Sequence, residues 1–246
     1  MITKEYGSNN KDVIIMLHGG GLSWWNYAGE KDILAEKYHL VIPILDGHSD
    51  SDKGFTSIED NADELISLID SRFNGNVKLI CGLSLGGQVL LEMLSKRNGL
   101  CSYAIIESAL AYPLKLTNQL IGAAVNMSYS LINKKWFSRL QFRSLKMKND
   151  LFESYYRDTC KIKKSDMIAF MKANSSYKLK AGLSGCKAKV LILVGEKERP
   201  VMKKSAITIH EKIPYSSLEI LNGCYHGELS INHADEYADK IKKLLG

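Results

Sequence analysis

The feature that most limits how this chain can fold is a repeated alternation between short apolar runs and longer amphipathic stretches. Six runs rich in Val, Ile and Leu show no regular polar alternation, which is typical of strands buried on both faces of a parallel sheet. Five further stretches have the periodicity of helices with one apolar face. This alternation predicts an α/β fold with a doubly wound, mostly parallel sheet. The expected strands are 12–21, 39–45, 76–84, 102–108, 188–196 and 216–222, and the expected helices are 26–37, 57–73, 86–97, 201–212 and 232–245.

The alternation is interrupted once, after the run that ends at 108. About 70 residues pass before the next apolar run, which is too long for an ordinary crossover loop. The interval contains amphipathic segments with helical periodicity. We therefore expect residues 1–111 and 183–246 to form the core of the fold, and residues 112–182 to form a helical cap inserted over one edge of the sheet.

Composition fits one large globular domain with such an insertion. The chain has 246 residues, of which 45% are apolar and 24% charged, an ordinary balance for a protein with a sizeable core. The net charge is +6, and residues 133–189 alone contain 15 Lys and Arg against 4 Asp and Glu. These basic residues are dispersed, and no nucleic-acid-binding motif accompanies them. We interpret them as a solvated helical face and expect no nucleic-acid partner.

The sequence also shows no pattern typical of a signal peptide, a transmembrane helix or paired cysteines. The N-terminal stretch is polar, without the apolar core of a signal peptide, and no apolar run approaches the roughly 20 residues of a transmembrane helix. The five cysteines include no CxxC pair. These features predict a cytoplasmic protein with reduced thiols and without a transmembrane segment, a disulfide framework or a zinc site.

A serine stands where one of the expected strands turns into a helix. In "VKLICGLSLGGQVLLEML" (77–94), Ser84 is flanked by Gly82 and Gly86, with Gly87 following. A sharp strand-to-helix turn exposes such a serine at the carboxyl edge of the sheet, and larger side chains two residues away would collide with backbone. A tight turn with a capping serine is the alternative. The surrounding strand and helix patterns favour a nucleophile.

A serine nucleophile needs donors for the developing oxyanion. "HGGG" (18–21) follows the first strong strand, and its glycines let backbone N–H groups approach a reacting carbonyl. We expect the Gly20 N–H and the N–H of Leu85, the residue after the serine, to form this pair. A phosphate-binding loop would require a following lysine, which is absent.

The nucleophile also needs a base and an acid that orients the base. Among six histidines, His226 lies in a glycine-flanked loop between the last expected strand and the last helix, where it can reach Ser84. The acid is open among three carboxylates at or just after the ends of expected strands. These are Glu196, Glu198 and Glu107.

With these residues assembled, the chain resembles the α/β-hydrolase fold superfamily over nearly its whole length. It is most similar to small bacterial lipase- and esterase-type members with a helical cap after the sixth strand of the fold. The order serine, acid, histidine matches that superfamily. The residues that carry the resemblance are "HGGG" (18–21), "GLSLGG" (82–87), "LILVGEKERP" (191–200) and "CYHGE" (224–228).

Two departures from the family pattern accompany the resemblance. Relatives usually have Gly-x-x-Asp-Pro after the seventh strand, with the aspartate as the acid. Here the aligned residue is Glu198, and Arg199 is inserted before Pro200. In "PILDGHSDS" (43–51) relatives often have Asp-x-Pro-Gly-His-Gly-x-Ser. The resemblance implies a triad of Ser84, His226 and Glu198, with Glu107 and Glu196 as alternative acids.

These residues predict a serine hydrolase that cleaves carboxylic esters of small to mid-length acyl groups through an acyl-enzyme, without a metal or organic cofactor. Thioesterase, lactonase, carbon–carbon bond hydrolase and acyltransferase activities remain alternatives on the same triad. A non-catalytic ligand-binding protein on the hydrolase scaffold, or a nucleic-acid- or membrane-binding module, is the alternative of another class. The expected partner is a small-molecule ester, and the oligomeric state is left open.

Most large apolar side chains of the insertion are expected to pack the cap, and a minority to line an acyl pocket facing Ser84. Trp24 or Trp25 is expected to form the opposite wall. The apolar set is Met127, Trp136, Phe137, Phe142, Phe152, Phe170 and Met171.

Overall fold

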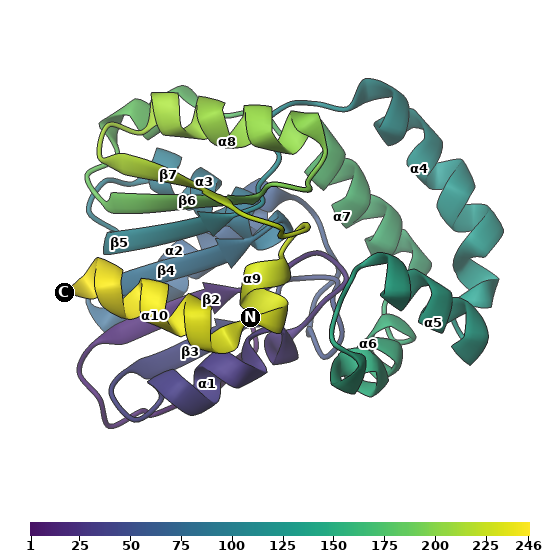
Figure 1. Cartoon of the computed structure of the whole chain (residues 1–246), viewed down its shortest axis with the longest axis horizontal. Coiled ribbons are helices and arrows are strands. Elements are labelled where there is room, and N and C mark those ends of the chain that lie inside the picture. Colours follow the sequence, from purple (N-terminus) through teal and green to yellow (C-terminus); the bar gives the residue numbers. More distant parts are fainter.

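The protein, a computed structural model that describes residues 1–246, is built on one seven-stranded sheet (Figure 1). The strand order is β1-β3-β2-β4-β5-β6-β7, in which β1 runs antiparallel to β3 and every other pair is parallel. The predicted doubly wound, mostly parallel α/β sheet is confirmed. The strands are β1 (Thr3–Tyr6), β2 (Val13–Leu17), β3 (His39–Pro43), β4 (Val77–Leu83), β5 (Cys101–Glu107), β6 (Lys189–Gly195) and β7 (Ser216–Leu221).

The six expected strands correspond to β2–β7, and β1 was missed. Its sequence, TKEY, is half-buried at every position, because it forms the edge of the sheet and pairs on one side only. A four-residue polar edge strand carries neither an apolar run nor a clear alternation, so nothing in the pattern marks it.

Helices cover both faces of the sheet (Figure 1). The expected helices are present, with an additional short helix before the last one. Within the core of the fold they are α1 (Ala28–Leu34), α2 (Ile58–Phe73), α3 (Leu85–Lys96), α8 (Pro200–Lys212), α9 (Glu228–Asn232) and α10 (Ala234–Leu245), and a 3₁₀ turn, Trp24–Tyr27, precedes α1.

The side chains of β2 show why the strands are apolar on both faces. Val13, Ile15 and Leu17 join a core of 38 buried residues with α2, α3 and α8, whereas Ile14 and Met16 join a second core with α1 and α10. Successive side chains of a strand point to opposite faces. A strand between two helical layers must therefore be apolar throughout, as the sequence pattern indicated.

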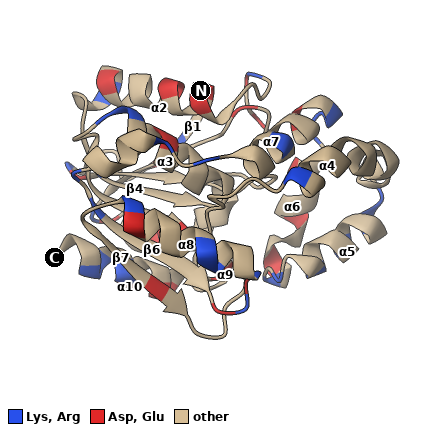
Figure 2. Ribbon diagram, turned by 90° about the horizontal axis from the view of Figure 1, so that it is seen from above, with Lys and Arg blue, Asp and Glu red and all other residues tan.

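The interval between β5 and β6 is helical and lies beyond the carboxyl ends of the strands (Figure 1). It follows β5, the fifth of the seven strands of this chain, directly after the apolar run that ends at 108. Its basic residues are scattered among uncharged ones (Figure 2). Its helices are α4 (Lys115–Ser128), α5 (Lys135–Ser144), α6 (Phe152–Thr159) and α7 (Lys164–Ser176), joined by 3₁₀ turns at Tyr129–Leu131 and Asn149–Leu151 and followed by one at Ala181–Gly185.

Trp25 fastens this insertion to the core. The Trp25 side chain is 2% exposed, and its Nε1–H donates to Oδ2 of Asp158, on α6, over 2.8 Å. Phe142 and Phe152 pack with Trp25 in a separate buried cluster. An apolar contact and a buried hydrogen bond thus join segments more than 100 residues apart in the chain.

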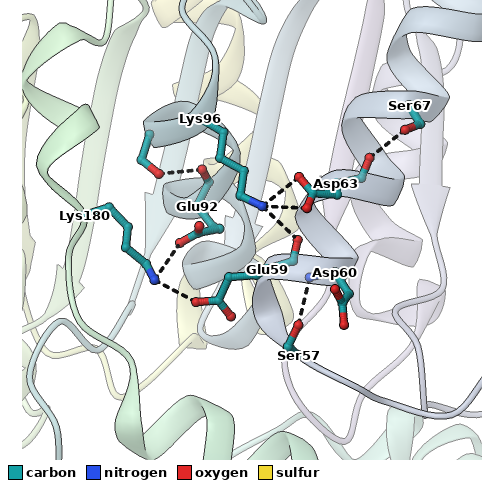
Figure 3. Close-up of polar contacts among 9 residues, drawn as sticks. Ser57, Glu59, Asp60, Asp63, Ser67, Glu92, Lys96 and Lys180 are labelled. Atoms are coloured by element: carbon teal, nitrogen blue, oxygen red, sulfur yellow. Dashed lines mark hydrogen bonds and ion pairs between the residues drawn. The ribbon is translucent and has the colours of Figure 1, made fainter.

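A network of ion pairs holds the end of the insertion against two helices of the core (Figure 3). The Lys180 ammonium lies 2.7 Å from Glu59 on α2 and 3.7 Å from Glu92 on α3. The Lys96 ammonium contacts Asp63 over 2.7 Å, which links α3 to α2 a second time. Burial raises the pKa of Glu92, and the shared lysine offsets part of that effect.

All five cysteines are free thiols. None of the helices combines the length and the hydropathy that a membrane crossing needs.

Candidate active site

Ser84 lies between β4 and α3 at a strained backbone turn. Its φ and ψ are 52° and −109°, a left-handed region that non-glycine residues rarely occupy. A Cβ on Gly82 would lie 2.5 Å from the Gly86 carbonyl oxygen, and one on Gly86 would collide with the carbonyls of Leu17 and His18. Both glycines are therefore required by close backbone approach, as the sequence predicted.

His226 reaches Ser84 from the loop between β7 and α9. Its Nε2 lies 3.0 Å from Ser84 Oγ, and its Nδ1 lies 2.7 Å from Oε2 of Glu198. Gly227 has a φ of 67° and no room for a Cβ beside Leu83, so the glycine after the histidine lets the loop pack against β4. The structure thus brings together the serine, the histidine and one of the three candidate acids.

Glu198 is buried, with 1% of its side chain exposed. Burial raises its pKa, but hydrogen bonds and charge from His226, together with bonds from Ser108 and the Gly195 N–H, outweigh burial and hold the pKa below its usual value. Its Oε1 accepts from Ser108 Oγ over 2.7 Å and from the Gly195 N–H over 2.8 Å. Glu198 is therefore a charged acceptor, and Nδ1–H of His226 donates to it.

Sequence reasoning missed Ser108. It has a φ of 54°, and its Oγ accepts from the N–H of Gly227 over 3.2 Å while donating to Glu198. This one hydroxyl therefore links the acid to the histidine loop. One feature of the sequence could have indicated Ser108: it directly follows the buried run "AIIE", at the same sheet edge as Ser84.

The other two carboxylates lie elsewhere. Glu107 is 1% exposed and accepts from the Ser230 N–H over 3.4 Å, with no bond to His226. Burial raises its pKa to about 7. Glu196 accepts from the N–H of Gly223 over 2.9 Å at the surface. Each accepts from a backbone N–H, and neither contacts His226.

The two expected oxyanion donors lie beside the serine. Leu85 is the first residue of α3, where the N–H has no intrahelical carbonyl. The N–H of Gly20 donates to no group of the chain, and the Gly20 Cα faces the Leu85 side chain. Both N–H groups are available to a ligand.

His18 fixes the turn that carries Gly20. Its Nε2 accepts from the Leu45 N–H over 3.1 Å, so its Nδ1 carries the hydrogen and donates to the Gly19 carbonyl over 2.9 Å. Burial and the neighbouring His48 lower its pKa to about 3. The ring is therefore neutral, and both nitrogens are used in holding the loop. The Gly19 N–H donates to Asn26, which sequence reasoning did not single out.

Two adjoining cavities flank Ser84. A cavity of about 470 Å³ lies on the His226 side, and one of about 260 Å³ lies on the side of Gly20 and Leu85. The larger is lined by Leu110, Leu145, Lys146, Lys197, Arg199, Met202 and Tyr225 among others. The smaller is lined by Thr117, Ile121, Phe170, Met171 and Ser175 among others.

The prediction of which side chains line the site is only partly correct. Phe170 and Met171 do line the smaller cavity, and Phe142 and Phe152 pack in the insertion. Neither Trp24 nor Trp25 lines either cavity, because Trp25 is turned into the contact with Asp158. Met127 and Trp136 are 81% and 65% exposed.

No group of three or more His, Cys, Asp or Glu side chains is placed to hold a metal ion. A doubly wound sheet with a serine at a strand-to-helix turn, and a histidine near it at the same sheet edge, defines an α/β-hydrolase type of protein. A family model described as the alpha/beta hydrolase family matches residues 14–240, and the chain belongs to this family.

Solved structures share this fold at low sequence identity. An esterase from Exiguobacterium antarcticum is 18% identical with a TM-score of 0.83, over 99% of this chain and 94% of the other. A thermophilic esterase from Thermogutta terrifontis is 15% identical with a TM-score of 0.80, over 100% and 94%. A bromoperoxidase from Bacillus anthracis is 17% identical with a TM-score of 0.83, over 99% and 94%. The likeness extends over the whole fold, and these neighbours differ in activity.

Proposed function

We propose that the protein is a serine carboxylic-ester hydrolase acting on small-molecule esters. Ser84, His226 and Glu198 form its triad, and the N–H groups of Gly20 and Leu85 form its oxyanion hole. The observation that carries the proposal is the hydrogen-bonded chain from Ser84 Oγ through both nitrogens of His226 to Glu198, at 3.0 and 2.7 Å.

The proposed reaction follows from these contacts. Nε2 of His226 takes the hydroxyl proton as Ser84 Oγ attacks the ester carbonyl, and the charged Glu198 stabilises the resulting imidazolium. The Gly20 and Leu85 N–H groups stabilise the oxyanion. His226 then gives the proton to the leaving alcohol, and water, activated by the same nitrogen, releases the acid from Ser84.

The 112–182 insertion acts in this proposal as a cap. It supplies Ile121, Phe170 and Met171 to the smaller cavity and Lys146 to the larger one. The same triad would serve thioester or lactone hydrolysis, carbon–carbon bond hydrolysis or acyl transfer. Cavities of 260 and 470 Å³ favour a small acyl group and a larger leaving group.

The proposal is tested with Ser84→Ala on an activated ester such as 4-nitrophenyl butyrate. We expect kcat to fall by on the order of 10³-fold or more, with the fold intact by circular dichroism. A fluorophosphonate probe is expected to label the wild type and not the variant. Labelling of the variant would place the nucleophile elsewhere, and an inactive, unlabelled wild type would favour a binding protein on the hydrolase scaffold.

A further inference from the structure

The larger cavity carries more positive charge than ester hydrolysis itself requires. Lys146, Lys197 and Arg199 line it, and of these only Arg199 also lines the smaller cavity. Its one carboxylate, Glu198, is turned toward His226. The three cations come from two separate segments, the stretch after α5 and the loop after β6. None of the three takes part in a salt bridge, and the Glu198 carboxylate contacts Nδ1 of His226 instead.

Two of these cations share one aromatic ring. The ammonium groups of Lys146 and Lys197 lie 5.5 and 5.1 Å from the centroid of the Tyr225 ring. Each is attracted by the electron-rich face of the ring, but two like charges so close together repel each other. Glu228 accepts from the Tyr225 N–H, and Glu196 from the Gly223 N–H. Neither carboxylate forms a salt bridge with Lys146 or Lys197.

The backbone at Lys146 is held in place. Lys146 has a φ of 57°, and its carbonyl accepts from Nδ2 of Asn232 over 2.7 Å. Oδ1 of the same asparagine, which is 7% exposed, accepts from the N–H of Lys148 over 2.9 Å. One buried side chain thus clamps the turn and keeps the Lys146 side chain at the rim of the cavity.

The chemistry of the triad tells which part of an ester would meet these cations. His226 must protonate the leaving alcohol, so the alcohol lies on the His226 side, in the larger cavity. The smaller cavity contains Gly20 and Leu85 together with the apolar side chains of Ile121 and Phe170. It therefore receives the acyl chain.

We propose, resting on the ester hydrolysis proposed above, that the alcohol part of the substrate carries a carboxylate or a phosphate that binds Lys146, Lys197 and Arg199. Hydrolysis then adds the hydroxyl of water to the acyl group and a proton to the alcohol oxygen. The products are a small apolar carboxylic acid and an anionic alcohol.

The test compares 3-butyryloxybenzoate with the neutral 3-butyryloxybenzamide, each kcat/KM being divided by the rate constant of hydroxide-catalysed hydrolysis. 3-Butyryloxyphenyl phosphate distinguishes phosphate from carboxylate. A second pair of esters, mono-4-nitrophenyl adipate and 4-nitrophenyl hexanoate, tests whether the enzyme prefers an anion on the acyl side instead. The proteins are the wild type, Lys146→Met/Lys197→Met and Lys189→Met, a control at the exposed start of β6.

We expect the wild type to have a higher corrected kcat/KM for the ester with the anionic leaving group than for the neutral ester. This preference should fall about tenfold in the double variant, because each removed cation contributes roughly threefold. The preference should also shrink between 0.05 and 1 M NaCl, and Lys189→Met should match the wild type on both esters. An unchanged preference in the double variant, or a preference confined to the acyl side, would overturn the inference and leave the esterase proposal standing. If the wild type cleaves neither ester, both proposals fail.

Discussion

Among single residues, Glu198 keeps a charged carboxylate although only 1% of its side chain is exposed. Burial alone would raise its pKa, yet bonds from His226, Ser108 and the Gly195 N–H lower it. A depressed pKa stabilises the fold at every pH above the ordinary carboxyl range, and this contribution is lost as the pH falls through the folded-state pKa. The hydrogen-bond partners of Glu198 thus keep the proposed acid charged.

Glu198→Gln removes the charge while keeping the shape of the side chain. Its amide donates hydrogen bonds, which favours the wrong tautomer of His226, so we expect kcat to fall by about 10³- to 10⁴-fold. Glu107→Gln is the matched control and should keep activity within a few-fold. Ester hydrolysis by both variants checks this, and the opposite ranking would assign the acid to Glu107, the last residue of β5.

We expect Glu107 to make the free energy of unfolding depend on pH. Burial raises its pKa to about 7 from an ordinary 4.5, so the folded protein binds more protons than the unfolded chain between these values. The free energy of unfolding should therefore decrease as the pH rises from about 4.5 to 7. Glu107→Gln, which cannot ionise, should gain up to about 3 kcal/mol relative to the wild type between pH 5 and 8. Urea unfolding at both pH values measures this, and a pH-independent difference would contradict it.

At the scale of elements, the β4–α3 turn depends on close backbone contact. Strand, turn and helix each follow the local sequence pattern, but the turn closes only because Gly82 and Gly86 leave no Cβ between the backbones. This turn gives Ser84 a φ of 52°. It also places the N-terminus of α3 beside the site.

Gly82→Ala should destabilise the protein by about 2–4 kcal/mol, because its Cβ would meet the Gly86 carbonyl at 2.5 Å. Gly122→Ala in α4 is the matched control, since nothing lies within 4 Å of its added Cβ. It should be neutral or stabilise by up to about 1 kcal/mol. Thermal unfolding of both variants separates them, and equal losses would show that the turn tolerates a side chain.

At the scale of the whole molecule, the insertion and the sheet edge together enclose the space around Ser84. The smaller cavity, of about 260 Å³, has walls from both parts, with Phe170 from α7 and Leu85 from α3. Its limited volume sets the length of acyl chain that the proposed enzyme accepts.

We expect kcat/KM for 4-nitrophenyl esters to rise from acetate by at most about fourfold per methylene, since burying one CH₂ contributes about 0.8 kcal/mol. The value should then fall once the chain outgrows the cavity. Measurement from acetate to palmitate checks the profile. Phe170→Ala should shift the maximum toward longer chains, and a flat profile in the wild type would exclude an enclosed acyl cavity.

The sequence by itself determined the layered α/β architecture, the place of the insertion and the glycine-flanked turn at Ser84. These depend on local periodicity and on steric limits within a few residues. Only the tertiary structure shows which of the three carboxylates contacts His226, because the partners of Glu198 come from Ser108, Gly195 and His226, which lie on three separate segments. The polar edge strand β1 was likewise decided by pairing with β3. A side chain's direction and hydrogen bonds arise from contacts between distant segments, and periodicity along the chain does not record them.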